Sequence, residues 1–177
     1  MVTVYYIIKL ITAPGALLKG FLEHLFCRIF KVPVEYAEYL QRSALCGHVE
    51  HFLAPKKGSF GICYFPHLIM LLLGLAISLP AGIKFFYFGT FGWAELLLFY
   101  VALCLLTNCF PLMEDAVNMW EKLYGEDASS KTVVKVLLSP FAVILYGGAW
   151  LEQYGLTLLL GLLEIIGLPY LLALIVG

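Results

Sequence analysis

The sequence is poor in charged residues, because Asp, Glu, Lys and Arg fill only 13% of its positions, about half the share of a soluble domain. The net charge is −1, so the chain does not have the basic excess expected for nucleic-acid binding, and we expect no nucleic-acid partner. Internal repeats, which mark many transporters, are also missing. Hydrophobic residues make up 62% of the chain instead, which predicts an integral membrane protein in contact with a lipid bilayer.

Paired cysteine motifs are absent as well. The chain has five cysteines, and none of them forms a Cys-x-x-Cys pair of the kind that binds zinc or exchanges disulfides. We therefore expect packed apolar thiols and no cofactor.

Long apolar windows dominate what the sequence does contain. A helix needs about 20 apolar residues to cross a bilayer of about 30 Å. Five windows meet this length: Val4–Phe30, Phe60–Pro80, Phe85–Phe110, Val133–Trp150 and Leu156–Gly177. The first window contains Pro14 and Gly15, which should break or kink it. The sequence predicts an all-α polytopic membrane protein with about five transmembrane helices, forming one membrane domain over residues 1–177.

Basic residues predict the orientation of these spans. Arg28, Lys31 and Arg42 lie at or after the end of the first window, whereas Lys84 is the one basic residue between the second and third. Because basic loops stay on the cytoplasmic side, we expect the N-terminus outside and the C-terminus in the cytoplasm.

The first cytoplasmic loop shows strand-like patterning. Apolar and polar residues alternate over residues 32–36 and again over residues 47–52, on either side of a polar turn region. This pattern predicts a small cytoplasmic β-hairpin after the first span. An exposed strand in such a hairpin can pair with an extended partner through main-chain hydrogen bonds.

Ionisable residues inside the first window need a reason, because charge at membrane depth is costly. Lys19 and Glu23 are four residues apart, so in a helix they share one face. This part of the chain, Thr12–Val32, resembles the motif helix of the site-2-protease-like intramembrane zinc metallopeptidases, through Pro14 with Gly15 and through Phe26-Cys27-Arg28. The resemblance places Lys19 and Glu23 where that family has its two zinc-binding histidines, and Gly20 where it has the general-base glutamate.

Two further stretches carry the same resemblance. The residues Gly47, His48, Val49, Glu50 and His51 fit the family's Gly-x-Val-x-His strand, which implies a partner-binding strand. Asp115, in a Phe-Pro to Asp-Ala-x-Asn-x-Trp stretch, matches the Asp that is the family's third metal ligand, although Leu112 replaces a serine. The resemblance covers about Pro14 to Tyr124, so we expect a metallopeptidase-like core at residues 1–125 and two additional C-terminal transmembrane helices at residues 132–177.

The degenerate motif leaves several alternatives open for its charges. A lysine ammonium repels a dication, so an ion-pair cluster of Lys19, Glu23 and Asp115 in place of zinc is one interpretation. Snorkelling of Lys19 and Glu23 toward the headgroups is a second, and a rebuilt zinc site is a third. Glu164 also interrupts an apolar window, which indicates an intramembrane contact with a neighbouring helix or a partner chain.

Three functions follow from these alternatives. The first is a catalytically inactive pseudopeptidase that binds or stabilises a membrane-protein partner, for which the resemblance implies a bacterial inner membrane. The second is a structural or assembly subunit of a larger membrane complex. The third, an active intramembrane metallopeptidase, would require the rebuilt zinc site, so the sequence favours a protein that is not an enzyme.

Overall fold

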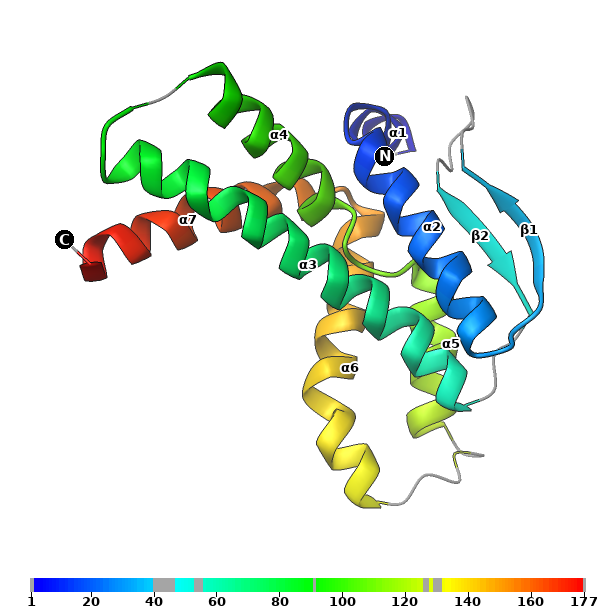
Figure 1. The fold of residues 1–177 in the computed structure, drawn as a ribbon. Helices are drawn as coiled ribbons and strands as arrows, with labels where there is room; N and C mark the ends of the chain where they lie inside the picture. Colours follow the sequence, from blue (N-terminus) through cyan, green and yellow to red (C-terminus); the bar gives the residue numbers. More distant parts are fainter. Residues whose placement is uncertain are drawn as a thin grey trace.

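The computed structural model describes residues 2–39, 47–52, 56–90, 92–125, 128 and 132–176. These residues form a mostly helical chain with one small antiparallel sheet (Figure 1), which confirms the expected helical class and the hairpin. The elements are α1 (Val2–Ile11), α2 (Ala13–Ile29), β1 (Val34–Glu38), β2 (His48–His51), α3 (Lys56–Phe86), α4 (Trp93–Thr107), α5 (Met113–Tyr124), α6 (Thr132–Gln153) and α7 (Thr157–Val176).

Helices α3, α4 and α7 pack side by side as one three-helix unit (Figure 1). Buried Ala102, Leu106 and Ile165 fill its interior between α4 and α7. Gly74 lets α3 and α4 approach closely, because a Cβ at this position would lie 2.7 Å from the Leu106 side chain. The unit therefore depends on small residues at its contacts, as membrane helix packing commonly does.

Helices α5 and α6 form a second packed region beside the first half of α3. Its buried residues are Cys63, Met119, Leu123, Ala142 and Leu145. From this region α6 projects away from α7 in Figure 1, and it meets α7 at the 154–156 turn. The C-terminal end of α6 is thereby brought toward the centre of the molecule.

The predicted break in the first window is confirmed at Thr12, between α1 and α2. Thr12 Oγ1 donates a hydrogen bond to the Ile8 carbonyl oxygen at 2.8 Å, and Pro14 lies in the first turn of α2. Proline fits this place because the first helical turn has no intrahelical N–H bonds to lose. The break divides the window into helices of 10 and 17 residues.

Three helices are long and apolar enough to cross a membrane: Gly58–Phe86, Thr132–Gln153 and Thr157–Ile175. They contain the predicted windows Phe60–Pro80 and Val133–Trp150, and they contain Leu156–Gly177 apart from its first residue and its last two. The window Phe85–Phe110 is not one helix, because α3 continues to Phe86 and a turn precedes α4. With 15 residues, α4 is about 22 Å long, shorter than a bilayer core of about 30 Å.

The hairpin packs against α2 (Figure 1). Its strands pair antiparallel with Tyr36 opposite Glu50 and Ala37 opposite Val49, and the register shifts between Val34 and Tyr36. Val49 is buried toward the helices, whereas Tyr36 and Glu50 are exposed. The alternation in the sequence therefore predicted the presence of the hairpin, whereas Tyr36, which alternates with Val34, is exposed beyond the shift in register.

Candidate functional site

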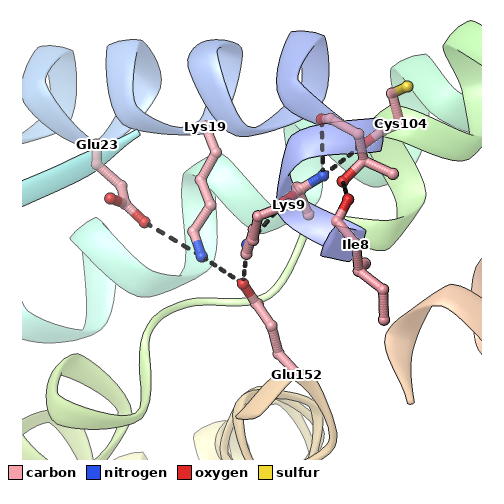
Figure 2. A network of polar contacts seen from close by, with 8 residues as sticks. Ile8, Lys9, Lys19, Glu23, Cys104 and Glu152 are labelled. Carbon is pink, nitrogen blue, oxygen red and sulfur yellow. Dashed lines mark hydrogen bonds and ion pairs between the residues drawn. The ribbon is translucent and has the colours of Figure 1, made fainter. Parts of the chain in front are cut away.

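Four charged side chains meet in the interior where α1, α2 and α6 converge. Glu152, near the end of α6, accepts hydrogen bonds at Oε1 from Lys9 Nζ at 2.5 Å and from Lys19 Nζ at 3.1 Å. Lys19 Nζ also lies 4.0 Å from Glu23 Oε1. Figure 2 shows both lysines pointing toward Glu152, with Glu23 on the far side of Lys19. We call these four residues the buried charge network.

Asn108, at the end of α4, ties this network to the backbone. Its Oδ1 accepts a hydrogen bond from Lys9 Nζ at 2.7 Å. Its Nδ2 donates to the carbonyl oxygens of Thr12 at 3.2 Å and Cys104 at 2.8 Å. One amide therefore joins the break between α1 and α2 to the end of α4.

The network is balanced in charge and excluded from solvent. It contains two ammonium groups and two carboxylates, and their side chains are only 4 to 7% exposed. Burying an ion is costly unless opposite charges and hydrogen bonds compensate for the lost water. Glu152 binds both lysines, although its buried Oε2 has no hydrogen-bond partner among the described residues.

Lys19 and Glu23 are adjacent, as their spacing of four residues predicts, and both are buried inside the protein. Their burial favours pairing over snorkelling toward headgroups. The closer carboxylate to Lys19 is nevertheless Glu152, which the sequence analysis overlooked together with Lys9. Lys9 lies inside the first apolar window and Glu152 just beyond the fourth. A charged residue at or near membrane depth is costly, and this cost could have identified both residues as candidates for pairing.

Asp115 makes its ion pair with the hairpin. Its Oδ1 lies 3.1 Å from His51 Nε2. The sequence analysis grouped Asp115 with Lys19 and Glu23, whereas the structure uses its carboxylate to join the first turn of α5 to β2. Hydrogen bonding and attraction to Asp115 raise the pKa of His51 from 6.5 to about 9, so the imidazole is charged at neutral pH.

Gly20 has a packing role that its place in the resembled motif did not indicate. A Cβ on Gly20 would lie 2.7 Å from the Gly47 carbonyl oxygen, and a Cβ on Gly47 would lie 2.1 Å from the Ala16 carbonyl oxygen. Gly47 also has a φ of +77°, a conformation that favours glycine. The two glycines let the start of β2 lie directly on α2, in the space that a larger side chain at position 20 would need.

The remaining predicted residues lie elsewhere. In the candidate strand Gly47–His51, the backbone pairs with β1, and the side chain of His48 lies outside the described residues. Glu164 is half-buried in α7 and makes no ion pair or hydrogen bond to any side chain or backbone group that the structure describes.

The described ranges contain His, Cys, Asp and Glu residues, the types whose side chains bind metal ions. Within them, no group of three or more His, Cys, Asp or Glu residues is arranged to hold a metal ion. Cys27, Cys63, Cys104 and Cys109 are buried free thiols, and Cys46 lies outside those ranges. Lys19 contacts both Glu23 and Glu152.

We compared the chain with family models, with curated proteins and with solved structures, and none of the three comparisons gives a match. The resemblance to site-2-protease-like metallopeptidases therefore stays a prediction that rests on the motifs themselves.

Proposed function

We propose that this protein is a catalytically inactive membrane protein, of site-2-protease-like design, that binds or stabilises another membrane protein. The buried charge network carries this proposal. At the positions where the resembled family holds zinc and its general base, this chain has a lysine bonded to Glu152 and a glycine packed on Gly47.

Catalysis by zinc needs ligands with free lone pairs and a base beside the activated water. Lys19 as an ammonium offers no lone pair, and its proton is retained by the carboxylates around it. A base at position 20 would collide with the hairpin backbone. The ligand requirement fails because of the residue type at position 19, and the base requirement fails because of both residue type and packing at position 20.

We propose further that the chain spans the bacterial inner membrane about five times, with its N-terminus outside and its C-terminus in the cytoplasm. The three long apolar helices support membrane insertion, and the basic residues support the orientation. Labelling with membrane-impermeant thiol reagents tests it: Cys46 should react from the cytoplasmic side and an exposed Thr90→Cys from the outside. The reverse result would reject this orientation.

A role as an assembly subunit is the second candidate. It is favoured by the apolar side chains that α6 and α7 leave exposed, including Val133, Val136 and Leu137 on α6 and Leu174 and Ile175 on α7. Lipid covers some of this surface, and partner helices would cover the rest in a complex. An obligate subunit should unfold when separated from its partner, whereas a partner-binding pseudopeptidase should stay folded alone.

Isolation from native membranes in mild detergent tests the proposed function. We expect a complex with one membrane protein at fixed stoichiometry, no stoichiometric zinc by elemental analysis, and no cleavage of membrane peptides. Tightly bound zinc with peptide cleavage would overturn the proposal, and so would a protein that is always isolated by itself.

A further inference from the structure

Glu164 is the one carboxylate in α7, the eighth of its 20 residues and about 10 Å along the helix from Thr157. The helix around it is otherwise apolar, and it belongs to the candidate span Thr157–Ile175. A carboxylate at this depth is costly in lipid, so such residues usually face a partner group.

Other interior acids of the chain have their partners within the fold. Glu152 binds Lys9 and Lys19, Asp115 pairs with His51, and Glu95 pairs with Lys84. Glu164 has no such partner among the described residues, and it is only half-buried. Its carboxyl group is therefore reachable from outside the fold.

The surface beside Glu164 suits a helix. Leu163 is 68% exposed, Ile166 and Leu171 are also exposed, and a Cβ on Gly167 would meet no atom within 4 Å. Gly167 follows Glu164 by three residues, so both lie on one side of α7. A small residue next to a polar one lets a second helix approach closely enough to bond to the polar group.

A second copy of this chain does not supply the complementary charge. In the long apolar helices, Lys56 and Lys57 lie in the first turn of α3, Lys84 lies in its last turn, and Lys135 lies in the first turn of α6. Lys9 and Lys19 are held inside the buried charge network. The charge complementary to Glu164 must come from a different protein.

We propose that α7 binds a transmembrane helix of another protein that carries a lysine or arginine at the depth of Glu164 and packs beside Gly167. This inference rests on the proposed function and specifies the chemistry of its partner. The basic residue pairs with the Glu164 carboxylate, and each charge offsets part of the other's cost of burial in lipid.

Designed probe helices test the inference without knowledge of the partner. The purified full chain is reconstituted in phosphatidylcholine vesicles with a labelled Leu- and Ala-rich single-span peptide that has a central Lys, or with its matched central-Leu peptide. Energy transfer measures association. We expect the Lys peptide to associate about 3- to 30-fold more strongly than the Leu peptide, the range measured for polar contacts between membrane helices.

Two variants separate charge from shape. Glu164→Leu should abolish the preference for the Lys peptide, and Gly167→Leu should weaken Lys-peptide association while the carboxylate remains. Leu137→Ala, at an exposed position on α6, is the matched control and should change nothing. Helix content by circular dichroism should be the same for all variants.

Equal association of the two peptides with the unmodified chain would overturn the inference, as would a preference that survives Glu164→Leu. Self-association through Glu164, detected as transfer between labelled copies that Glu164→Leu removes, would also overturn it. Co-isolation from native membranes remains a separate readout. A Glu164→Leu chain that still isolates with its partner would reject this docking site and leave the proposed function standing.

Discussion

Glu152 and Glu164 lie on consecutive helices, but one carboxylate is paired inside the fold and the other is not paired with any described residue. Glu152 ends α6 in the interior, where its Oε1 accepts hydrogen bonds from two lysines. Glu164 lies in α7, half-buried, with no ion pair to a described residue. Both carboxylates interrupt apolar sequence and carry the same formal charge. The comparison shows that the packing around a carboxylate, and not its formal charge, decides whether it is paired inside the fold.

The contrast also assigns a role to residues 132–177. Lys9 and Lys19 come from the first two helices, yet their carboxylate comes from the end of α6. The C-terminal helices therefore complete the interior of the core that the sequence analysis placed at residues 1–125. Removing them would leave two buried ammonium groups without their main counter-ion.

The largest expected effect comes from breaking the paired side of the comparison. Glu152→Leu should lower the free energy of unfolding by about 3 to 5 kcal/mol, because two buried lysines lose their shared acceptor. Glu164→Leu should change it little or raise it, since no internal contact is lost. Thermal unfolding of both variants in detergent measures the difference, and equal stabilities would show that the buried charge network does not stabilise the fold.

Removing Lys19 should have a smaller effect, near the low end of the same range, about 3 kcal/mol, because Lys9 still neutralises Glu152. In Lys19→Met, Glu23 is left as the carboxylate without a cation. The double variant Lys19→Met with Glu23→Leu should recover much of the lost stability. A double-mutant cycle on unfolding free energies measures their coupling. Purely additive effects would mean that the 4.0 Å approach of Lys19 to Glu23 contributes nothing.

Gly20→Ala probes the contact between the hairpin and α2. Its new Cβ would meet the Gly47 carbonyl oxygen at 2.7 Å, so the hairpin must shift, and we expect a loss of about 1 to 3 kcal/mol. Gly147→Ala, where a Cβ meets nothing within 4 Å, is the matched control and should be neutral or stabilising. Gly20→Glu, one of the changes that would restore a His-Glu-x-x-His motif, should displace β2 for the same reason. A Gly20→Ala protein as stable as the parent would contradict this packing.

Local patterns in the sequence predicted the parts of this structure that depend on near neighbours. The break at Thr12 follows from Pro14, and the adjacency of Lys19 and Glu23 follows from helical spacing. The start of α4 was missed because aromatic residues continue the apolar run before it, although Gly89 and Gly92 are residues typical of a turn.

Ion-pair partners that lie far apart in the chain could not be predicted from the sequence. Glu152 lies 133 residues from Lys19, and its turn at the end of α6 has no pattern that specifies where it packs. Asp115 was expected beside Lys19 and Glu23 because of the family resemblance. A resemblance gives the order of motifs along the chain, but it does not give the ion-pair partner of a residue once the motif has changed. His51 became that partner because β2 lies against the helices at Gly47.

The smallest expected effect concerns this His51 and Asp115 pair, which resembles the Glu152 contacts but lies at a less buried place. The pKa of His51 is raised from 6.5 to about 9 in the folded protein, so the pair contributes fully below pH 6.5 and is lost as the pH rises through 9. We expect a contribution of about 1 kcal/mol or less, typical of a partly solvated ion pair. Melting temperatures between pH 6 and pH 10 should fall more for the unmodified chain than for Asp115→Asn, in which the histidine has no carboxylate to bind. Identical pH profiles for the two proteins would show that Asp115 does not hold the imidazole in its charged form.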